Sequence, residues 1–365
     1  MKITKKNTVR PICIVLGTRP EIIKMAPVIK ECIRTRKAFY IIHSGQHYSR
    51  EMDAIFFENL GLPQPLYNLE VGSGSHVAVI SSIMQGMEKV FTQSRPRIVL
   101  VQGDTNTVLA GAMTAHKMNI PVGHIEAGLR SFDLTMPEES NRIMVDHISD
   151  YLFAPTILSS KNLIREHITP QKIHIVGNTI VEAVKQFLPP TSKQKRILNS
   201  YGVSSKRFSI VTLHRPHNVD DPERLQNILS AIGNSDTSEE ILFLAHPRTK
   251  KQIVEHGITL PSHLRMQEPI GYFDMLTLEA NSSLIFTDSG GLQEEACILG
   301  VPCITIRPNT ERPETILLHS NMLAEPSHES LTHAIRIMSK ARTWKHPFGD
   351  GNTSRQILAC IEHLQ

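Results

Sequence analysis

The sequence lacks the usual marks of an exported, redox-active or membrane-bound protein. Its five cysteines form no CxxC pair, and Cys13 and Cys303 lie in apolar runs, so we interpret them as buried, reduced thiols. The apolar run Ile12–Leu16 is too short for the core of a signal peptide. No run approaches the roughly 20 residues of a membrane span. We therefore expect a cytoplasmic chain without a membrane partner.

Charge of one sign and nucleotide-binding fingerprints are lacking as well. Lys and Arg total 39 against 35 Asp and Glu, which gives a formal charge of +4. This excess is too small to predict a nucleic-acid partner, although it suits an anionic small molecule. Neither a G-x-G-x-x-G fingerprint nor a Walker loop is present. No HxxxH helix or Cys/His cluster is present either, so we expect no metal.

The 365 residues alternate short β-rich runs with longer amphipathic runs. This alternation predicts an α/β fold of doubly wound parallel sheets, and the length predicts two domains. The predicted strands are 12–16, 39–43, 98–102, 121–125, 151–154, 173–176, 208–213, 241–245, 284–287 and 303–306. The predicted helices include 21–36, 75–92, 105–118, 138–149, 222–232 and 291–299.

A break in the pattern between about 178 and 206 separates the two predicted domains. We place a first Rossmann-like domain at 1–180, a second at 181–350 and a final segment at 351–365. Two such domains facing each other would leave a cleft lined by the carboxyl ends of both sheets. The residues just past each strand are therefore the candidates for function.

A glycine-containing turn follows the predicted strand 284–287 and opens a helix. Ser289, Gly290 and Gly291 can bring backbone N–H groups and a hydroxyl to an anion, and the helix N-terminus adds partial positive charge. Glu295, about one turn inside the helix, can accept hydrogen bonds from ribose hydroxyls. The alternative is an ordinary strand-to-helix turn, which Ser-Gly-Gly would serve equally well.

Three cations lie in comparable positions after strands. Arg19 and Lys24 follow the first strand, and Arg312 lies in the loop after the last predicted strand. Together they can balance a diphosphate, and arginine can contact it through two nitrogens. The alternative is that they are solvated surface cations.

Three carboxylates follow strands or begin a helix in the first domain. Asp104 and Glu126 lie at the ends of two predicted strands, and Glu138 begins a predicted helix. Neighbouring strands of a parallel sheet lie about 4.8 Å apart, so carboxylates at their ends can share one pocket. Crowded carboxylates differ in pKa, which provides an acid and a base at one pH. Asp104 could instead cap a helix, and Glu138 could simply favour a helix N-terminus. Glu126 needs a partner, and Arg130 is a candidate.

His214 closes the strand 208–213 in the second domain, where it can contact a sugar hydroxyl or a phosphate. The alternative is a structural histidine, since the chain contains 18 of them.

Ten motifs, in order along nearly the whole chain, resemble the non-hydrolysing UDP-N-acetylglucosamine 2-epimerase family. They are GTRPEIIKMAP (17–27), GQHY (45–48), QGDTNTVLAG (102–111), PVGHIEAGLRS (121–131), MPEESNR (136–142), VGNTIVEA (176–183), LHRPHNV (213–219), TDSGGLQEEA (287–296), TERPE (310–314) and GDGNTSRQI (349–357). The resemblance implies a GT-B architecture in which a C-terminal helix, here 353–364, returns to the first domain. It also implies a homodimer.

The same resemblance implies a reaction and assigns residues to it. The implied reaction converts UDP-N-acetylglucosamine to UDP-N-acetylmannosamine by anti elimination of UDP and re-addition through 2-acetamidoglucal, without cofactor or metal. The implied residues for the uridine diphosphate are Arg19, Lys24, Ser289, Gly290, Gly291, Glu295 and Arg312. Those implied around the sugar are Asp104, Glu126, Glu138 and His214, and those implied for a candidate allosteric site are Gln46, His47, Arg215 and His246.

Four alternatives stay open at this point. The chain could be a GT-B glycosyltransferase with an acceptor, a hydrolysing epimerase, a sister 2-epimerase on a modified UDP-sugar, or a nucleotide-sugar sensor without chemistry. Two departures from the family pattern stand out. His217 stands where many members place a glutamate, and the segment 131–136 is shorter than in some members.

Overall fold

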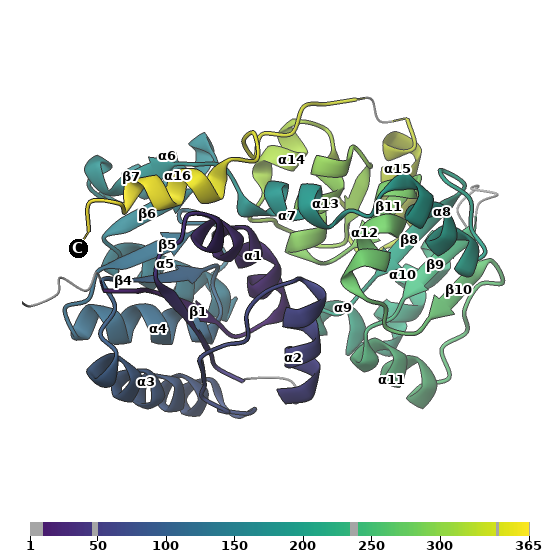
Figure 1. Cartoon of the computed structure of the whole chain (residues 1–365). Helices are drawn as coiled ribbons and strands as arrows, with labels where there is room; N and C mark the ends of the chain where they lie inside the picture. The colour runs from purple at the N-terminus through teal and green to yellow at the C-terminus, as the bar shows by residue number, and fades with distance from the viewer. Residues whose placement is uncertain (1–9, 46–49, 234–239, 341–342, 365) are drawn as a thin grey trace, which may run out of the picture. The chain divides into compact units, whose positions relative to one another are not determined.

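The computed structural model describes residues 10–45, 50–233, 240–340 and 343–364. The chain divides into two compact units (Figure 1): unit 1 comprises Met1–Ala183 and Phe348–Gln365, and unit 2 comprises Val184–Pro347. Helix α7 (Thr179–Phe187) crosses the first division, so the change of unit falls inside a helix. The sequence interpretation had placed the changes of domain at 180/181 and 350/351.

Unit 1 contains, among its described residues, a seven-stranded parallel sheet in the order β3-β2-β1-β4-β5-β6-β7. Its strands are β1 (Ile12–Leu16), β2 (Phe39–His43), β3 (Tyr67–Asn68), β4 (Ile98–Gln102), β5 (Val122–Ile125), β6 (Tyr151–Ala154) and β7 (Ile173–Ile175). Its helices are α1 (Arg19–Arg34), α2 (Arg50–Asn59), α3 (His76–Gln93), α4 (Asn106–Lys117), α5 (Pro137–Ile148), α6 (Ile157–Arg165), the short 3-10 helix Pro170–Lys172 and α16 (Thr353–Cys360).

Unit 2 repeats the plan with six parallel strands in its described part, in the order β10-β9-β8-β11-β12-β13. The strands are β8 (Phe208–Thr212), β9 (Glu240–Leu244), β10 (Leu264–Gln267), β11 (Leu284–Thr287), β12 (Cys303–Thr305) and β13 (Asn321–Leu323). The helices are α8 (Thr191–Ser200), α9 (Pro216–Val219), α10 (Pro222–Gly233), α11 (Pro247–Glu255), α12 (Tyr272–Asn281), α13 (Gly290–Leu299), α14 (Pro313–Leu317) and α15 (His328–Met338).

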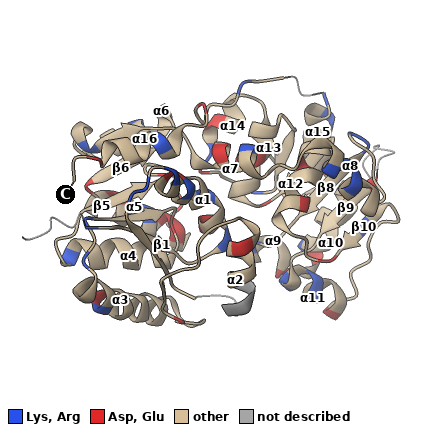
Figure 2. Cartoon of the chain, viewed as in Figure 1, with Lys and Arg blue, Asp and Glu red and all other residues tan. Residues whose placement is uncertain are grey.

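The central strands of both sheets are largely apolar and buried. Every residue of β1 and β4 is buried, as expected for strands covered on both faces. Acidic and basic residues are spread over both units (Figure 2), in keeping with the near balance of charge. The prediction of two Rossmann-like parallel-sheet domains is confirmed, and observed element ends differ from the predicted ones by a few residues.

The last helix belongs to the first unit. Helix α16, yellow in Figure 1, packs beside α1, and Ser354 Oγ donates to Glu182 Oε1 at 2.6 Å. The incoming segment crosses unit 1 at Gly177, where Asn178 N donates to Phe348 O at 2.9 Å. Gly177 has a φ of 85°, and a β-carbon there would lie 2.9 Å from Phe348 O. Glycine is therefore required for this crossing.

In the described part of the chain, no helix has the length and apolar character that crossing a membrane requires.

Candidate active site

Both sheets reverse their strand order at their centre, and the sequence motifs follow the strands at those points. In unit 1 the order reverses between β1 and β4, and in unit 2 between β8 and β11. Ligands of open α/β sheets bind outside the carboxyl ends of the strands at such a switch point. The segments that follow these four strands begin at Gly17, Gly103, Leu213 and Asp288, and they contain most of the candidate residues.

Glu126 lies at the carboxyl end of β5 with only 3% of its side chain exposed. Its carboxylate pairs with the Lys24 ammonium and accepts hydrogen bonds from the amides of Gln102 and Asn178, the last at 2.9 Å. Glu126 has a φ of 69°, in the left-handed region, which costs a non-glycine residue about 1–3 kcal/mol. These three polar contacts of the carboxylate offset the cost of the left-handed backbone. Lys24 is therefore a buried ion-pair partner and not a surface cation.

The suggested pairing of Glu126 with Arg130 is wrong. Arg130 pairs with Asp146 (Nη1–Oδ2 2.7 Å) and with Glu166 (Nη2–Oε2 2.6 Å). The chain turns at Gly128, which has a φ of 82° and where a β-carbon would lie 2.3 Å from a backbone oxygen of α6. This turn takes Arg130 to carboxylates associated with α5 and α6, away from the end of β5.

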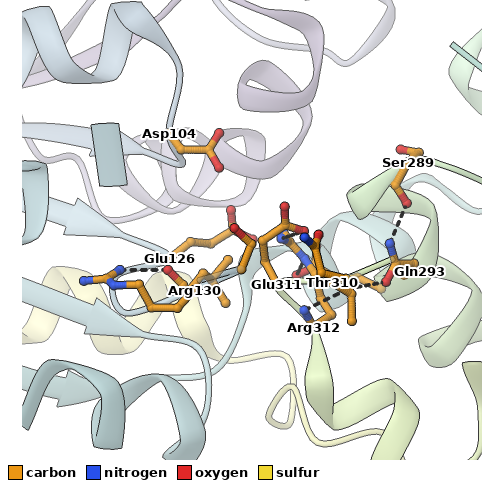
Figure 3. Close-up of polar contacts among 12 residues, drawn as sticks. Asp104, Glu126, Arg130, Ser289, Gln293, Thr310, Glu311 and Arg312 are labelled. Carbon is orange, nitrogen blue, oxygen red and sulfur yellow. Dashed lines mark hydrogen bonds and ion pairs between the residues drawn. The ribbon is translucent and has the colours of Figure 1, made fainter. Parts of the chain in front are cut away.

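Asp104 follows β4 and is drawn in Figure 3. Its carboxylate pairs with the Arg142 guanidinium and is 28% exposed, and Asn141 Nδ2 donates to its backbone oxygen at 2.9 Å. Thr105 caps α4, since its hydroxyl oxygen accepts from Val108 N. The alternative interpretation of Asp104 as a helix cap is therefore wrong, and its carboxylate remains partly accessible.

Arg142 was not among the residues selected from the sequence. Its guanidinium pairs with both Asp104 and the buried Glu139. Glu139 in turn accepts hydrogen bonds at 2.9 Å from the backbone N–H groups of Ser131 and Phe132. The Arg142 guanidinium thus connects Asp104, after β4, to Glu139, which holds the loop before α5. The i, i+3 spacing of Glu139 and Arg142 was the sequence signal that could have identified Arg142.

Glu138 is the second residue of α5 and is exposed. It lines a cavity of about 250 Å³ together with Thr105, Asn106 and Asn141. A carboxylate in the first turn of a helix is also favoured by the helix dipole. The position of Glu138 therefore fits both interpretations made from the sequence.

Glu21 is a further acid that the sequence interpretation passed over. It is 2% exposed and accepts hydrogen bonds from Gly17 N at 2.6 Å and from the Thr105 hydroxyl at 2.7 Å. Burial raises the pKa of Glu21 from 4.5 to about 7, and these hydrogen bonds offset only part of that rise. The Glu21 carboxyl, whose pKa is near neutral, thus contacts Thr105, the residue that follows Asp104.

This raised pKa predicts a pH-dependent stability. The folded state binds the Glu21 proton more tightly than the unfolded chain, so stability is full below pH 4.5 and is lost as pH rises through about 7. The shift corresponds to a loss on the order of 3 kcal/mol. We expect urea unfolding at pH 5, 7 and 9 to show this decline, and we expect Glu21→Gln to flatten it. An equal decline in the variant would assign the effect to other groups.

Arg19 is the first residue of α1 and is half-buried. Its guanidinium carbon lies 5.5 Å from the centre of the Phe56 ring, within the range of a cation–π contact. This contact orients the arginine at the carboxyl end of β1.

In unit 2 a buried carboxylate organises the loop after β8. Asp288 accepts from the backbone N–H groups of His214 (3.1 Å) and Arg215 (3.0 Å), and His214 Nδ1 lies 2.8 Å from its Oδ1. Burial alone would raise the pKa of Asp288, but His214, Arg215 and Asn218 hold it below its usual range. With Nδ1 engaged, Nε2 of the 43% exposed His214 side chain is the ring nitrogen that a ligand can reach.

The glycine turn opens α13 directly after Asp288. Ser289 is the N-cap residue but its side chain makes no capping hydrogen bond. A β-carbon at Gly290 would make only ordinary contact, 3.5 Å from Arg312 Nη1, and one at Gly291 would lie 3.9 Å from Ser289 Oγ. Packing within unit 2 therefore requires neither glycine, which favours the anion-binding interpretation over an ordinary turn.

Arg312 lies beside this helix N-terminus within a buried ion-pair network. Its Nε is 3.0 Å from Glu294 Oε1 and its Nη1 is 3.4 Å from Glu311 Oε2. Arg307 Nη2 lies 2.9 Å from the other oxygen of Glu311, so the two acids are matched by two arginines. The network fixes the Arg312 guanidinium next to Gly290.

Hydrogen bonds through Gln293 tie the loop that carries Arg312 to α13 (Figure 3). Thr310 Oγ1 donates to Gln293 Oε1 at 2.6 Å, and Gln293 Nε2 donates to Ser289 O at 3.2 Å. Gln293 thus connects the Ser289 backbone to the loop that carries Arg312.

Glu295, 6% exposed, accepts a hydrogen bond at 3.0 Å from the Tyr272 hydroxyl. The fully buried Glu279 of α12 interacts with it electrostatically. Burial, and then the charge of Glu295, raise the pKa of Glu279 well above its usual value, which favours the neutral form of Glu279.

Comparison with known proteins decides the family. A family model described as UDP-N-acetylglucosamine 2-epimerase matches residues 30–362. The Methanococcus maripaludis protein named UDP-N-acetylglucosamine 2-epimerase is 51% identical over 359 residues, which cover 96% of this chain and 98% of that protein. The chain belongs to the UDP-N-acetylglucosamine 2-epimerase family.

Two further relatives place the chain within this family. A crystal structure of the Methanocaldococcus jannaschii UDP-GlcNAc 2-epimerase in complex with UDP-GlcNAc and UDP is 48% identical, with a TM-score of 0.90 over 97% of this chain and 99% of that chain. The Pseudomonas aeruginosa UDP-2,3-diacetamido-2,3-dideoxy-D-glucuronate 2-epimerase is 38% identical over 97% of this chain and 99% of that protein. The family resemblance and the GT-B type of fold predicted from the sequence are confirmed.

The candidate allosteric residues of this 2-epimerase family member are only partly described. Gln46 and His47 lie outside the described residues. Arg215 Nε donates to Asp288 O at 3.0 Å, and the ring of His246 is centred 6.2 Å from that of His214. Burial, His214 and Arg248 lower the pKa of His246, and its Nδ1 accepts from Arg248 N at the start of α11.

No group of three or more His, Cys, Asp or Glu that could hold a metal ion occurs in the described part of the epimerase chain. The five cysteines are free thiols, four of them buried.

Proposed function

We propose that the chain catalyses the reversible epimerisation of UDP-N-acetylglucosamine to UDP-N-acetylmannosamine at C2 of the hexose. A carboxylate removes the C2 proton while the C1–O bond to UDP breaks, which gives 2-acetamidoglucal and UDP. A proton then returns to the opposite face of C2 and a diphosphate oxygen rebonds to C1. The enzyme is thus an isomerase, and the reaction needs no oxidant, reductant or metal.

One observation supports this proposal most strongly. The chain is a member of this family, and it has an acid, Asp104, directly after a switch-point strand of the first sheet and a glycine turn directly after a switch-point strand of the second. A base and an anion-binding turn are the two components that the elimination requires. Asp104, Glu126 and Glu138 would surround the sugar, and one of them is the C2 base. A positioned acid or base supplies roughly 10²–10⁴-fold in rate.

The turn before α13 would hold the departing diphosphate. Gly290 and Gly291 offer backbone N–H groups and Ser289 its hydroxyl. Arg312 offers a guanidinium that its ion pair with Glu294 already fixes. Preorganised donors that stabilise developing negative charge contribute at least as much as proton transfer. Arg19 and Lys24 would add positive charge, Glu295 would bind the ribose, and His214 would present Nε2 to the sugar or to a phosphate.

A specific alternative is a sister reaction on a modified UDP-sugar. The Pseudomonas aeruginosa relative acts, by its name, on a diacetamido glucuronate, and it covers this chain almost completely. Initial rates on a panel of UDP-sugars separate the two substrates.

The deciding test is incubation of the purified protein with UDP-N-acetylglucosamine alone, without an acceptor. We expect the manno isomer to accumulate with UDP still attached. Free N-acetylmannosamine plus UDP would identify a hydrolysing epimerase. An inert substrate would reject epimerisation in favour of a glycosyltransferase or a sensor.

Deuterium labelling tests the proton-transfer route. In D₂O we expect one deuterium at C2 of the product, because the abstracted proton is replaced by one from a carboxyl in exchange with solvent. Proton NMR or mass spectrometry of the UDP-sugars measures this. Product formed without deuterium would contradict elimination and re-addition.

We also propose that the protein works in the cytoplasm as a homodimer. Free, buried thiols are typical of a reducing compartment.

The proposal of a dimer is supported by apolar surface that association would cover. This surface comprises a groove between α3 and α4, lined by Ile80, Met84 and Met118, and the 79% exposed Val77. Light scattering should give twice the mass of one chain, and the mass of a single chain would contradict the dimer.

A further inference from the structure

His124 is a histidine of β5 to which the proposed reaction gives no role. Its side chain is fully buried, and both of its ring nitrogens face oxygen atoms. Nδ1 lies 2.7 Å from Asp146 Oδ1 on α5, and Nε2 lies 2.8 Å from Gly103 O. Gly103 directly precedes Asp104. One side chain thus connects α5 to the backbone of a proposed catalytic acid.

The hydrogen bonds determine the protonation of the His124 ring. A carbonyl oxygen can only accept, so Nε2 carries the hydrogen that it shares with Gly103 O. The Asp146 carboxylate pairs with Arg130 and accepts from Gly128 N at 3.1 Å. Burial would raise the pKa of Asp146, but the charges and hydrogen bonds of His124 and Arg130 hold it below its usual range. An ionised carboxylate can only accept as well, so Nδ1 also carries a hydrogen and His124 is an imidazolium.

The pair of His124 and Asp146 belongs to a chain of alternating charges. Asp146 Oδ2 lies 2.7 Å from Arg130 Nη1, and Arg130 Nη2 lies 2.6 Å from Glu166 Oε2. Glu166 is 25% exposed, and His147 Nε2 lies 3.5 Å from its Oε2. Each charge has an opposite charge beside it, which holds Asp146 and, through it, the His124 ring in one orientation.

Gly103 is held by β5 through both ends of its backbone. Its N–H donates to Ile125 O at 3.1 Å, and its carbonyl accepts from His124 Nε2. Its φ of 86° lies in the left-handed region, so the chain turns sharply there. The two contacts come from the residues directly before Glu126. One segment therefore fixes the turn before Asp104 and supplies the second acid.

The contact at Gly103 adds a constraint that the other contacts of Asp104 do not provide. Arg142 pairs with the Asp104 carboxylate, and Asn141 donates to the Asp104 backbone oxygen. Neither orients the peptide that leads into Asp104, whereas a hydrogen bond to the Gly103 carbonyl does. A proton-transfer group has to lie within hydrogen-bond reach of its proton, and a displacement of about 1 Å can cost roughly 10²-fold in rate.

We propose that His124 is a positioning residue of the epimerisation, which holds the Gly103 carbonyl and thereby sets the place of Asp104 relative to Glu126. The inference rests on the proposed function, because it assumes that these carboxylates act on the sugar. His124 acts through the backbone, since its side chain has no exposed surface with which to contact a ligand.

The test compares two amides at position 124. In His124→Gln the amide nitrogen comes close to the place of Nε2, where it can donate to Gly103 O. In His124→Asn the shorter side chain brings the nitrogen to the place of Nδ1, where it reaches Asp146 but not Gly103. Both variants lose the positive charge, so their thermal stabilities should fall to a similar extent. Glu166→Gln, in the same chain of charges, is the matched control.

We expect His124→Asn to lower kcat about 10- to 100-fold while KM for UDP-N-acetylglucosamine changes less than about threefold. His124→Gln should keep kcat within about fivefold of the wild type, because its hydrogen bond to the Gly103 carbonyl remains. Glu166→Gln should match the wild type. The calorimetric Kd for UDP should change less than about twofold in all three variants, because the glycine turn proposed for the diphosphate belongs to unit 2.

Equal kcat in His124→Gln and His124→Asn, at whatever level, overturns the proposal. If His124→Asn does not bind UDP, His124→Met replaces it, since methionine has the length of glutamine but no N–H group. Loss of UDP binding in all the variants at position 124 would assign His124 to the fold alone and would also overturn the proposal. Failure of the proposed function looks different, because the wild type itself would then leave UDP-N-acetylglucosamine unconverted.

Discussion

Glu126→Gln is expected to lower turnover of UDP-N-acetylglucosamine at least about 100-fold. The carboxylate is held by Lys24, Gln102 and Asn178 at the end of β5, and glutamine keeps its shape but cannot accept a proton. Equivalent losses are expected for Asp104→Asn and Glu138→Gln. Steady-state rates with the UDP-sugar measure all three.

Stability has to be separated from chemistry in this experiment, because Glu126→Gln leaves the Lys24 ammonium buried without its counter-charge. Removal of one partner of a buried pair costs about 3–5 kcal/mol. The double variant Lys24→Met/Glu126→Gln should regain thermal stability while turnover stays low. Glu166→Gln, which removes a partner of Arg130, is the matched control and should keep most of the activity. Near-normal turnover in all three acid variants would refute their assignment.

Arg312→Lys is expected to lower kcat/KM about 10²–10³-fold. Lysine keeps the positive charge, but a single ammonium cannot contact Glu294, Glu311 and a diphosphate as the fixed guanidinium fork can. The loss of one preorganised donor to a developing anion has an effect of this size. Initial rates across substrate concentrations give kcat/KM.

The control for Arg312→Lys is Arg307→Lys in the same buried network. Arg307 also pairs with Glu311, so its replacement disturbs the same network but leaves the Arg312 guanidinium beside Gly290 in place. We expect a comparable drop in thermal stability and a much smaller drop in kcat/KM. A similar kinetic loss in both variants would mean that Arg312 acts only through folding.

The fold could be predicted from the sequence because buried parallel strands have a local signature. The run at β1 is apolar throughout, those at β4 and β11 are apolar up to a final Gln102 and Thr287, and the extents of all three coincide with the prediction. Strands β3, β10 and β13 were missed. They are short, and their segments contain polar residues, so none of them forms the continuous apolar run by which the buried strands were recognised. The order of the strands is a property of tertiary contacts and had to come from the structure.

Candidate site residues could be selected from the sequence only where a residue follows a strand. Asp104, Glu126 and His214 were selected in this way, whereas the partners that orient them come from distant segments. Asn178 is 52 residues from Glu126 in sequence, and no local pattern connects the two. Arg130 was wrongly paired for the same reason, because a turn at Gly128 reverses its direction.

The return of α16 to unit 1 affects how the chain is made and how it tolerates shortening. Unit 1 is discontinuous, so during synthesis its first 183 residues leave the ribosome long before the segment that covers α1. The amino-terminal half therefore reaches its native state only after unit 2 has been translated. Loss of a dozen residues from the carboxyl terminus would damage the opposite end of the polypeptide, by uncovering α1 and leaving the Glu182 carboxylate without its serine.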